Sequence, residues 1–144
     1  MKLYTIGANQ VSAEDFFTTL IDNKVKSIVD IRLTPDTMFC GFTKQEHFPY
    51  FLKTIADIDY IERLEAAPTK ILRDDFKNEL IPWPEFKKQY LKLIKERDIN
   101  SYFSKTMLNR SCLLCSESDY HHCHRKILGE YLVKQFEGFD LIHL

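Results

Sequence analysis

Residues 111–135 read SCLLCSESDYHHCHRKILGEYLVKQ, and the spacing of apolar residues changes halfway along this stretch. Residues 111–115 form an apolar run bounded by polar residues, which is typical of a strand buried on both faces, although a buried helix segment has the same pattern. After Cys123 the apolar residues follow a helical period, at Ile127, Leu128, Tyr131, Leu132 and Phe136. Gly138 lies where a helix cap is expected, and residues 139–144 predict another strand. The stretch therefore predicts strand, loop, helix and strand, the crossover unit of a parallel sheet.

The loop at residues 116–122 is where we expect a ligand. It leaves the carboxyl end of a strand and enters the amino end of a helix, the edge at which open α/β sheets bind ligands. The first helical turn offers unpaired N–H groups and a partial positive charge, and Arg125 adds a guanidinium group. The position favours an anionic ligand.

Composition indicates one domain over residues 1–144, because 144 residues with 44% hydrophobic and 13% aromatic side chains can bury a substantial core. A net charge of −1 gives no electrostatic reason to expect nucleic acid or a membrane surface as a partner. The amino terminus lacks the apolar region of a secretory signal, and no run approaches the ~20 apolar residues of a membrane span. We therefore expect a cytoplasmic protein with no membrane partner.

In that compartment the four cysteines are expected to be thiols, metal ligands or a redox pair rather than structural disulfides. They are Cys40, Cys112, Cys115 and Cys123.

Before residue 33 the chain predicts a βαβ unit. Strands are expected at residues 2–6 and 27–32, and between them a helix capped by Ser12 that ends near Asn23. The irregular stretch at residues 33–42 has a length more typical of a lid or binding loop than of a simple connection.

The middle of the chain predicts alternating helix and strand followed by an irregular insertion. The expected elements are a helix from Thr43 or Glu46 to Ile58, a strand at 59–64, an irregular segment at 65–81 with one helical turn at 75–80, a helix with Pro84 in its first position, and a short helix within 100–109. The predicted fold class is thus α/β, a single domain with a mainly parallel sheet of about five strands flanked by helices.

Asp30 and Arg32 are two residues apart in a predicted strand, so their side chains point to the same face. Two interpretations stay open. The two residues form an ion pair or hydrogen bonds that support the following loop, or Arg32 joins Arg125 at the rim of one crevice.

Several short motifs carry a resemblance to a known family. They are Thr5-Ile6-Gly7, Asp30-Ile31-Arg32 with Pro35, Leu114-Cys115 with Glu117, and Cys123-His124-Arg125. With these motifs the chain resembles the bacterial and archaeal family known as domain of unknown function 488, over most of its length. The resemblance implies an α/β domain of unassigned biochemistry, so it supports the fold and the site and supplies no reaction.

The chain departs from that family's pattern in two places. Ala8 and Asn9 follow the Thr-Ile-Gly where the family usually has histidine and then serine, and Leu64-Glu65-Ala66 replaces a usual Leu-Gly-Gly. A looser similarity is to rhodanese-like domains, in which a strand ending in Asp and Arg precedes a cysteine loop and a helix. The loop after Cys115 is longer and has no glycine, so this similarity implies architecture only.

A cysteine nucleophile needs a lowered pKa. Cys123 lies at the predicted helix entrance beside His124 and Arg125, so we expect it to be more reactive than Cys115, whose pKa a buried strand would raise. The structural alternative is that either cysteine packs as a small hydrophobic side chain.

Zinc is a second possibility, because cysteines and histidines cluster in this stretch. Cys112 and Cys115 point to opposite faces of a strand and cannot chelate together. The expected zinc set is therefore Cys115, Cys123 and one histidine, taken as His121.

Glu117 and His124 are candidates for general acid–base chemistry, although Glu117 capping the helix or pairing with Arg125 is an equally open interpretation. The predicted catalytic residues are Cys115, Glu117, Cys123 and His124, and the predicted ligand-binding residues are Gly7, Asn9, Asp30, Arg32 and Arg125.

Two classes of function remain, an enzyme that acts on a small anionic or nucleotide-like ligand and a binding module whose cluster is structural or binds zinc. Exposure discriminates between them. A functional Arg32 and Arg125 would converge on an open pocket, whereas structural ones would be buried with protein partners.

Overall fold

The computed structural model describes residues 1–35 and 41–144. Cys40 and most of the loop predicted at residues 33–42 lie outside the described residues. The strands are β1 (Lys2–Gly7), β2 (Ser27–Asp30), β3 (Asp59–Glu62), β4 (Ser111–Cys115) and β5 (Asp140–His143). They form one sheet in the order β3-β2-β4-β1-β5, and every pair is parallel. The predicted α/β class and the five-stranded parallel sheet are confirmed.

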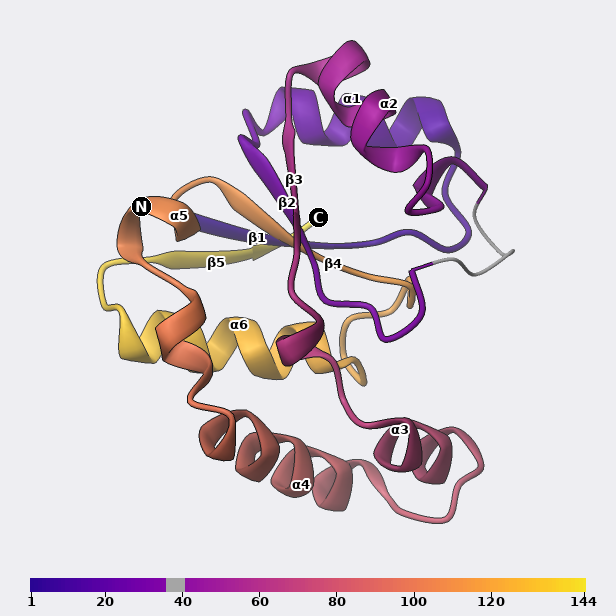
Figure 1. Ribbon diagram of the computed structural model, residues 1–144, viewed down its shortest axis with the longest axis vertical. Helices are drawn as coiled ribbons and strands as arrows, with labels where there is room; N and C mark the ends of the chain where they lie inside the picture. Colours follow the sequence, from indigo (N-terminus) through magenta and orange to yellow (C-terminus); the bar gives the residue numbers. More distant parts are fainter. Residues whose placement is uncertain (36–40) are drawn as a thin grey trace.

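Helices cover both faces of this sheet (Figure 1). They are α1 (Ala13–Asp22), α2 (Phe48–Ala56), α3 (Lys70–Lys77), α4 (Trp83–Glu96), α5 (Lys105–Leu108) and α6 (His124–Gln135), with 3₁₀ turns η1 (Gly41–Thr43), η2 (Leu64–Ala66) and η3 (Ile99–Tyr102). Helices α1 and α2 lie on one face, and α6 with α4 lies on the other. No helix among the described residues is long and apolar enough to cross a membrane.

The two-residue period of the strands sorts their side chains into two hydrophobic cores. Leu3, Val29 and Leu113 pack with α4 and α6, whereas the neighbouring Tyr4 and Cys112 pack with α1 and α2. Since β4 is buried along its whole length between β1 and β2, it is apolar on both faces. The prediction that Cys112 and Cys115 point to opposite faces follows this alternation.

The largest difference from the predicted elements is α3. We expected residues 65–81 to be irregular with a helical turn at 75–80, and the structure instead has the helix Lys70–Lys77. Thr69 caps it by accepting a hydrogen bond from the Leu72 N–H at 3.1 Å, and Leu72 and Phe76, four residues apart, pack toward α4. The expectation was wrong because only two apolar side chains mark the buried face, and the neighbouring Ile71 is exposed.

Smaller differences concern the ends of elements. Strand β2 ends at Asp30 rather than Arg32, β3 ends at Glu62, and α2 spans Phe48–Ala56 rather than reaching Ile58. The cap of α6 is Phe136, and Gly138 follows two residues later with φ of +85°. That backbone conformation is one that glycine adopts without strain.

Gly7 allows β1 to lie directly against the loop that follows β4. An added Cβ at Gly7 would lie 1.9 Å from the carbonyl oxygen of Glu117, closer than any real contact. Beyond Gly7, the N–H groups of Ala8 and Asn9 donate to the carbonyls of Cys115 and Ser116 at 3.0 and 2.9 Å. Gly7 therefore fixes where residues 116–118 run.

We expect Gly7→Ala to lower the free energy of unfolding by about 1–3 kcal/mol, because the loop backbone must move away from the new methyl group. Urea unfolding followed by circular dichroism measures the change. The matched control is Gly41→Ala, where an added Cβ meets no atom of the described residues within 4 Å. Equal stability of the two variants would contradict the proposed role of Gly7.

Candidate functional site

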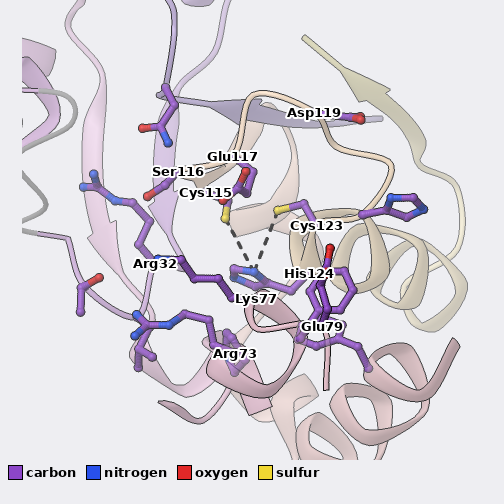
Figure 2. A pocket seen from close by; sticks show the side chains of 17 residues that line it. Arg32, Arg73, Lys77, Glu79, Cys115, Ser116, Glu117, Asp119, Cys123 and His124 are labelled. Carbon is purple, nitrogen blue, oxygen red and sulfur yellow. Dashed lines mark hydrogen bonds between the residues drawn. The ribbon is translucent and has the colours of Figure 1, made fainter. Parts of the chain in front are cut away.

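Two thiols and one imidazole meet where β4 passes into α6. Cys115 ends β4, Cys123 is the N-cap of α6, and His124 is the first residue of that helix. His124 Nδ1 lies 3.6 Å from Cys115 Sγ and 4.0 Å from Cys123 Sγ (Figure 2). One donor atom from each of the three residues lies within 4.8 Å of the others, and all three residues are buried. We call this group the Cys–His cluster.

Contacts from other parts of the chain fix the ring of His124. Its Nε2 lies 2.9 Å from the carbonyl oxygen of Ile31, directly after β2. The edge of Tyr90 in α4 packs against the ring at a centroid distance of 5.6 Å, and the Tyr90 hydroxyl donates to the Ala66 carbonyl at 2.6 Å. Since only a protonated Nε2 can donate to the Ile31 carbonyl, the Nδ1 atom that faces the two sulfurs holds a lone pair when the ring is neutral.

Arg125 points away from the cluster's open side and holds the loop. It is 1% exposed, and its guanidinium group donates to the carbonyls of Glu117 and Ser118 and, at 3.4 Å, to Cys123 Sγ. The bond to Ser118 is 3.1 Å long. The predicted pairing of Arg125 with Glu117 exists, but through the main-chain carbonyl of Glu117.

Arg32 is also engaged by the protein. Its guanidinium group makes two hydrogen bonds of 2.9 and 2.7 Å to the carboxylate of Asp30, and it donates to the Thr43 carbonyl at 2.7 Å. Tyr60 in β3 donates its hydroxyl to the same carboxylate at 2.7 Å. Burial lowers the pKa of Arg32, but the bonds and charge of Asp30 outweigh it and raise the pKa above its ordinary value. The ion-pair interpretation of Asp30 and Arg32 describes what the structure shows.

A cavity of about 710 Å³ lies over the Cys–His cluster. Its lining includes six of the residues predicted from sequence, namely Asn9, Arg32, Cys115, Glu117, Cys123 and His124. The lining does not include the other three predicted residues, Gly7, Asp30 and Arg125. They contact lining residues or the loop that carries them. The prediction that the end of β2 and the Cys–His–Arg turn lie side by side holds, because β2 and β4 are paired neighbours.

One wall of the cavity comes from a helix that the sequence did not reveal. Arg73, Phe76 and Lys77 of α3, with Glu79 just after it, line the cavity opposite the cluster (Figure 2). These four residues were not predicted from the sequence, because α3 itself was not predicted. The signal available in the sequence was Thr69 as an N-cap followed by Leu72 and Phe76.

The two thiols of the cluster have opposite pKa shifts. The pKa of Cys115 lies well below the usual value, first because it accepts a hydrogen bond from Cys123 and then because of the charge of His124 and the N–H of Glu117. Burial, followed by the bond to Cys115, raises the pKa of Cys123. The sequence led us to expect the lower pKa at Cys123, and the structure places it at Cys115. The reason is that Cys115 accepts the hydrogen bond between the two thiols and Cys123 donates it.

His124 gains a raised pKa in the same arrangement. Burial alone would lower it, but the negative charge of Cys115 and the hydrogen bond between them more than compensate. The three groups of the cluster are thus electrostatically coupled: Cys115 is the sulfur that favours the charged form, and it favours a proton on His124 in turn.

The remaining cysteines and histidines of the central stretch lie elsewhere. Cys112 faces α1 and α2, where burial raises its pKa. His121 is exposed and its Nδ1 lies 2.7 Å from Asp119 Oδ1, and the ring of His122 packs against Trp83 at 5.2 Å. The histidine that joins Cys115 and Cys123 is thus His124 rather than His121.

Together the fold and the cluster define an α/β protein with a cysteine–histidine pocket at the carboxyl edge of its parallel sheet. The profile of the family described as "Domain of unknown function DUF488" matches residues 12–132. The chain belongs to that family. No curated protein and no solved structure matches the chain, so the similarity to rhodanese-like domains stays a prediction.

We expect Arg125→Met to lower the free energy of unfolding by about 2–4 kcal/mol, because two loop carbonyls lose a charged donor inside the protein. Hydrogen exchange of the amides at residues 117–122 should accelerate. The control is Arg63→Met, which removes a partly exposed arginine that also donates to main-chain carbonyls. Unchanged loop exchange in Arg125→Met would show that Arg125 does not hold the loop.

Proposed function

We propose that the protein binds a small anionic or nucleotide-like ligand in the cavity over the Cys–His cluster and acts on it as an enzyme. The observation that carries the proposal is the shared cavity. One space of about 710 Å³ is lined by the two thiols and the imidazole of the cluster, by three acidic residues that include Glu117, and by three cationic residues. Cavities of about 300–1,000 Å³ are typical of small-molecule sites.

The charge of the cavity wall supports an anionic ligand at the α3 side. Arg73 and Lys77 are four residues apart on α3, so their side chains lie on one face of the helix. Arg73 shares its charge with Asp74 at 3.0 Å, whereas Lys77 is exposed and makes no hydrogen bond or ion pair within residues 1–35 and 41–144. Lys77 is thus available to bind an anion from the cavity.

The same wall suits a flat apolar group. Phe76 and Phe86 line the cavity with their ring centroids 4.9 Å apart. On the opposite side, the Oδ1 atom of Asn9 is buried and has no hydrogen-bond partner among the described residues. A ligand with a planar ring, a polar edge and an anionic group would satisfy all three features.

A non-catalytic binding module is the second candidate function. It is favoured by the burial of Arg32 and Arg125 against protein partners, which is the arrangement expected of structural arginines. These two residues therefore do not support catalysis, and the enzymatic proposal depends on the Cys–His cluster and Glu117. Product analysis after prolonged incubation with a bound ligand separates the two candidates.

We expect a thermal-shift screen of inorganic phosphate, nucleoside monophosphates and dicarboxylates to find a compound that raises Tm. At about 100 times its Kd the shift should be roughly 5–10 °C. The double variant Arg73→Ala/Lys77→Ala should lose most of that shift, because it removes the anion-binding side chains of α3.

The matched control is Lys88→Ala/Lys92→Ala, which removes two positive charges at the same spacing from α4, outside the cavity. It should keep the full shift. If no compound in the screen raises Tm, or if both double variants lose the shift equally, the proposed ligand site is wrong.

A further inference from the structure

The donor atoms of the Cys–His cluster have the spacing of metal ligands. Zinc bound to sulfur at about 2.3 Å and to nitrogen at about 2.0–2.1 Å in tetrahedral geometry places a sulfur and a nitrogen ligand roughly 3.5 Å apart. His124 Nδ1 lies 3.6 and 4.0 Å from the two sulfurs. Both sulfur-to-nitrogen distances are thus within about half an ångström of the zinc value, and all three donor atoms lie within 4.8 Å of one another.

The second ring nitrogen of His124 is held as in metal sites. Histidine ligands usually donate their other N–H to a carboxylate or a backbone carbonyl, which fixes the tautomer and aims the free lone pair at the metal. Here Nε2 lies 2.9 Å from the Ile31 carbonyl, and Tyr90 packs its edge against the ring. When the ring is neutral, the lone pair of Nδ1 thus faces the two sulfurs.

The surroundings of the sulfurs suit two thiolates. The N–H of Glu117 favours the charged form of Cys115, and the guanidinium group of Arg125 donates to Cys123 Sγ at 3.4 Å. Cys123 also caps the amino end of α6, where the helix dipole favours negative charge. Two thiolates and one Zn²⁺ sum to zero charge, which makes burial of all three side chains favourable.

Three protein ligands leave one tetrahedral position, and the structure shows where it faces. All three residues line the cavity, so the open position is directed into it (Figure 2). Cys112 lies on the other side of the sheet, and His121 is bound to Asp119. His122 lines the same cavity but packs against Trp83, and the metal-ligand group found among the described residues holds only Cys115, Cys123 and His124. Three protein ligands and one open position are typical of catalytic rather than structural zinc sites.

The geometry points to a zinc ion held by Cys115, Cys123 and His124 Nδ1, with its fourth position open to the cavity for water or for the anionic group of the ligand. Three acidic residues line the same cavity, and Glu117, two residues after Cys115, is the one we assign to accept a proton from a bound water. The metal site stands on its own geometry, whereas the binding of the anionic group at the metal rests on the function proposed above.

The test is metal analysis of the full chain, purified without a histidine tag or chelator and reduced before zinc is added. We expect one zinc per chain in the wild type and less than a tenth of that in Cys115→Ser, Cys123→Ser and His124→Ala. The matched controls Cys112→Ser and His121→Ala should keep full zinc. Cobalt added to the zinc-free wild type should give the absorption of thiolate-to-cobalt charge transfer, which keeps the test valid if a ligand variant fails to fold.

Absence of zinc and of the cobalt absorption in the reduced, folded wild type would overturn the metal site, as would loss of zinc in His121→Ala with retention in His124→Ala. Recovery of a Cys115–Cys123 disulfide instead, with no metal bound after reduction, would overturn it in favour of a redox pair.

The ligand screen, repeated on zinc-free and zinc-loaded protein, tests the role of the open position separately. A shift at least threefold larger with zinc supports binding of the anionic group at the metal. An equal Tm shift in both forms would show that the anionic group does not bind at the metal. It would not contradict the metal site or ligand binding in the cavity.

Discussion

The backbone of Ile31 is the link on which the site depends. Its N–H donates to the Leu114 carbonyl at 3.1 Å, which continues the pairing of β2 with β4 by one residue beyond the strand. Its carbonyl accepts from His124, at the start of α6. The backbone of one residue therefore aligns two neighbouring strands and the helix that follows one of them. Because the sheet is parallel and buried, this alignment is as rigid as the core, and the imidazole is held at a defined distance from both thiols.

Around this link the arginines and the reactive groups have separate tasks. Arg125 donates hydrogen bonds to two loop carbonyls and one sulfur, and Arg32 is paired with Asp30. Apart from Arg125 Nε, which is buried without a hydrogen-bond partner among the described residues, these guanidinium nitrogens donate to protein atoms, so the two arginines give little to a ligand. The cation that lines the cavity without such a partner among the described residues is Lys77 of α3, a helix that packs against α4. The anion-binding part of the cavity and its chemical part thus come from different layers of the fold.

Much of the fold could be predicted because the spacing of apolar residues changes between β4 and α6. Ser12 was also recognisable as a helix N-cap, and the structure confirms it. The meeting of β2 and the Cys123 turn at one edge also followed from the rule that ligands bind at the carboxyl ends of parallel strands. Helix α3 escaped because its buried face holds only Leu72 and Phe76. The choice of His124 over His121 depends on one hydrogen bond to Ile31, a residue 93 positions away, which no local pattern contains. The direction of Arg125 likewise depends on how the loop folds back over Gly7.

The central place of β4 governs how the chain can assemble as it is synthesised. In the order β3-β2-β4-β1-β5, β1 pairs with β4 and β5 among the described residues, and β2 pairs with β3 and β4. Until β4 has been synthesised, β1 therefore has both edges unpaired and β2 has one. Exposed strand edges of this kind pair readily with other chains, so slow translation before residue 111 prolongs the exposure of these edges to aggregation.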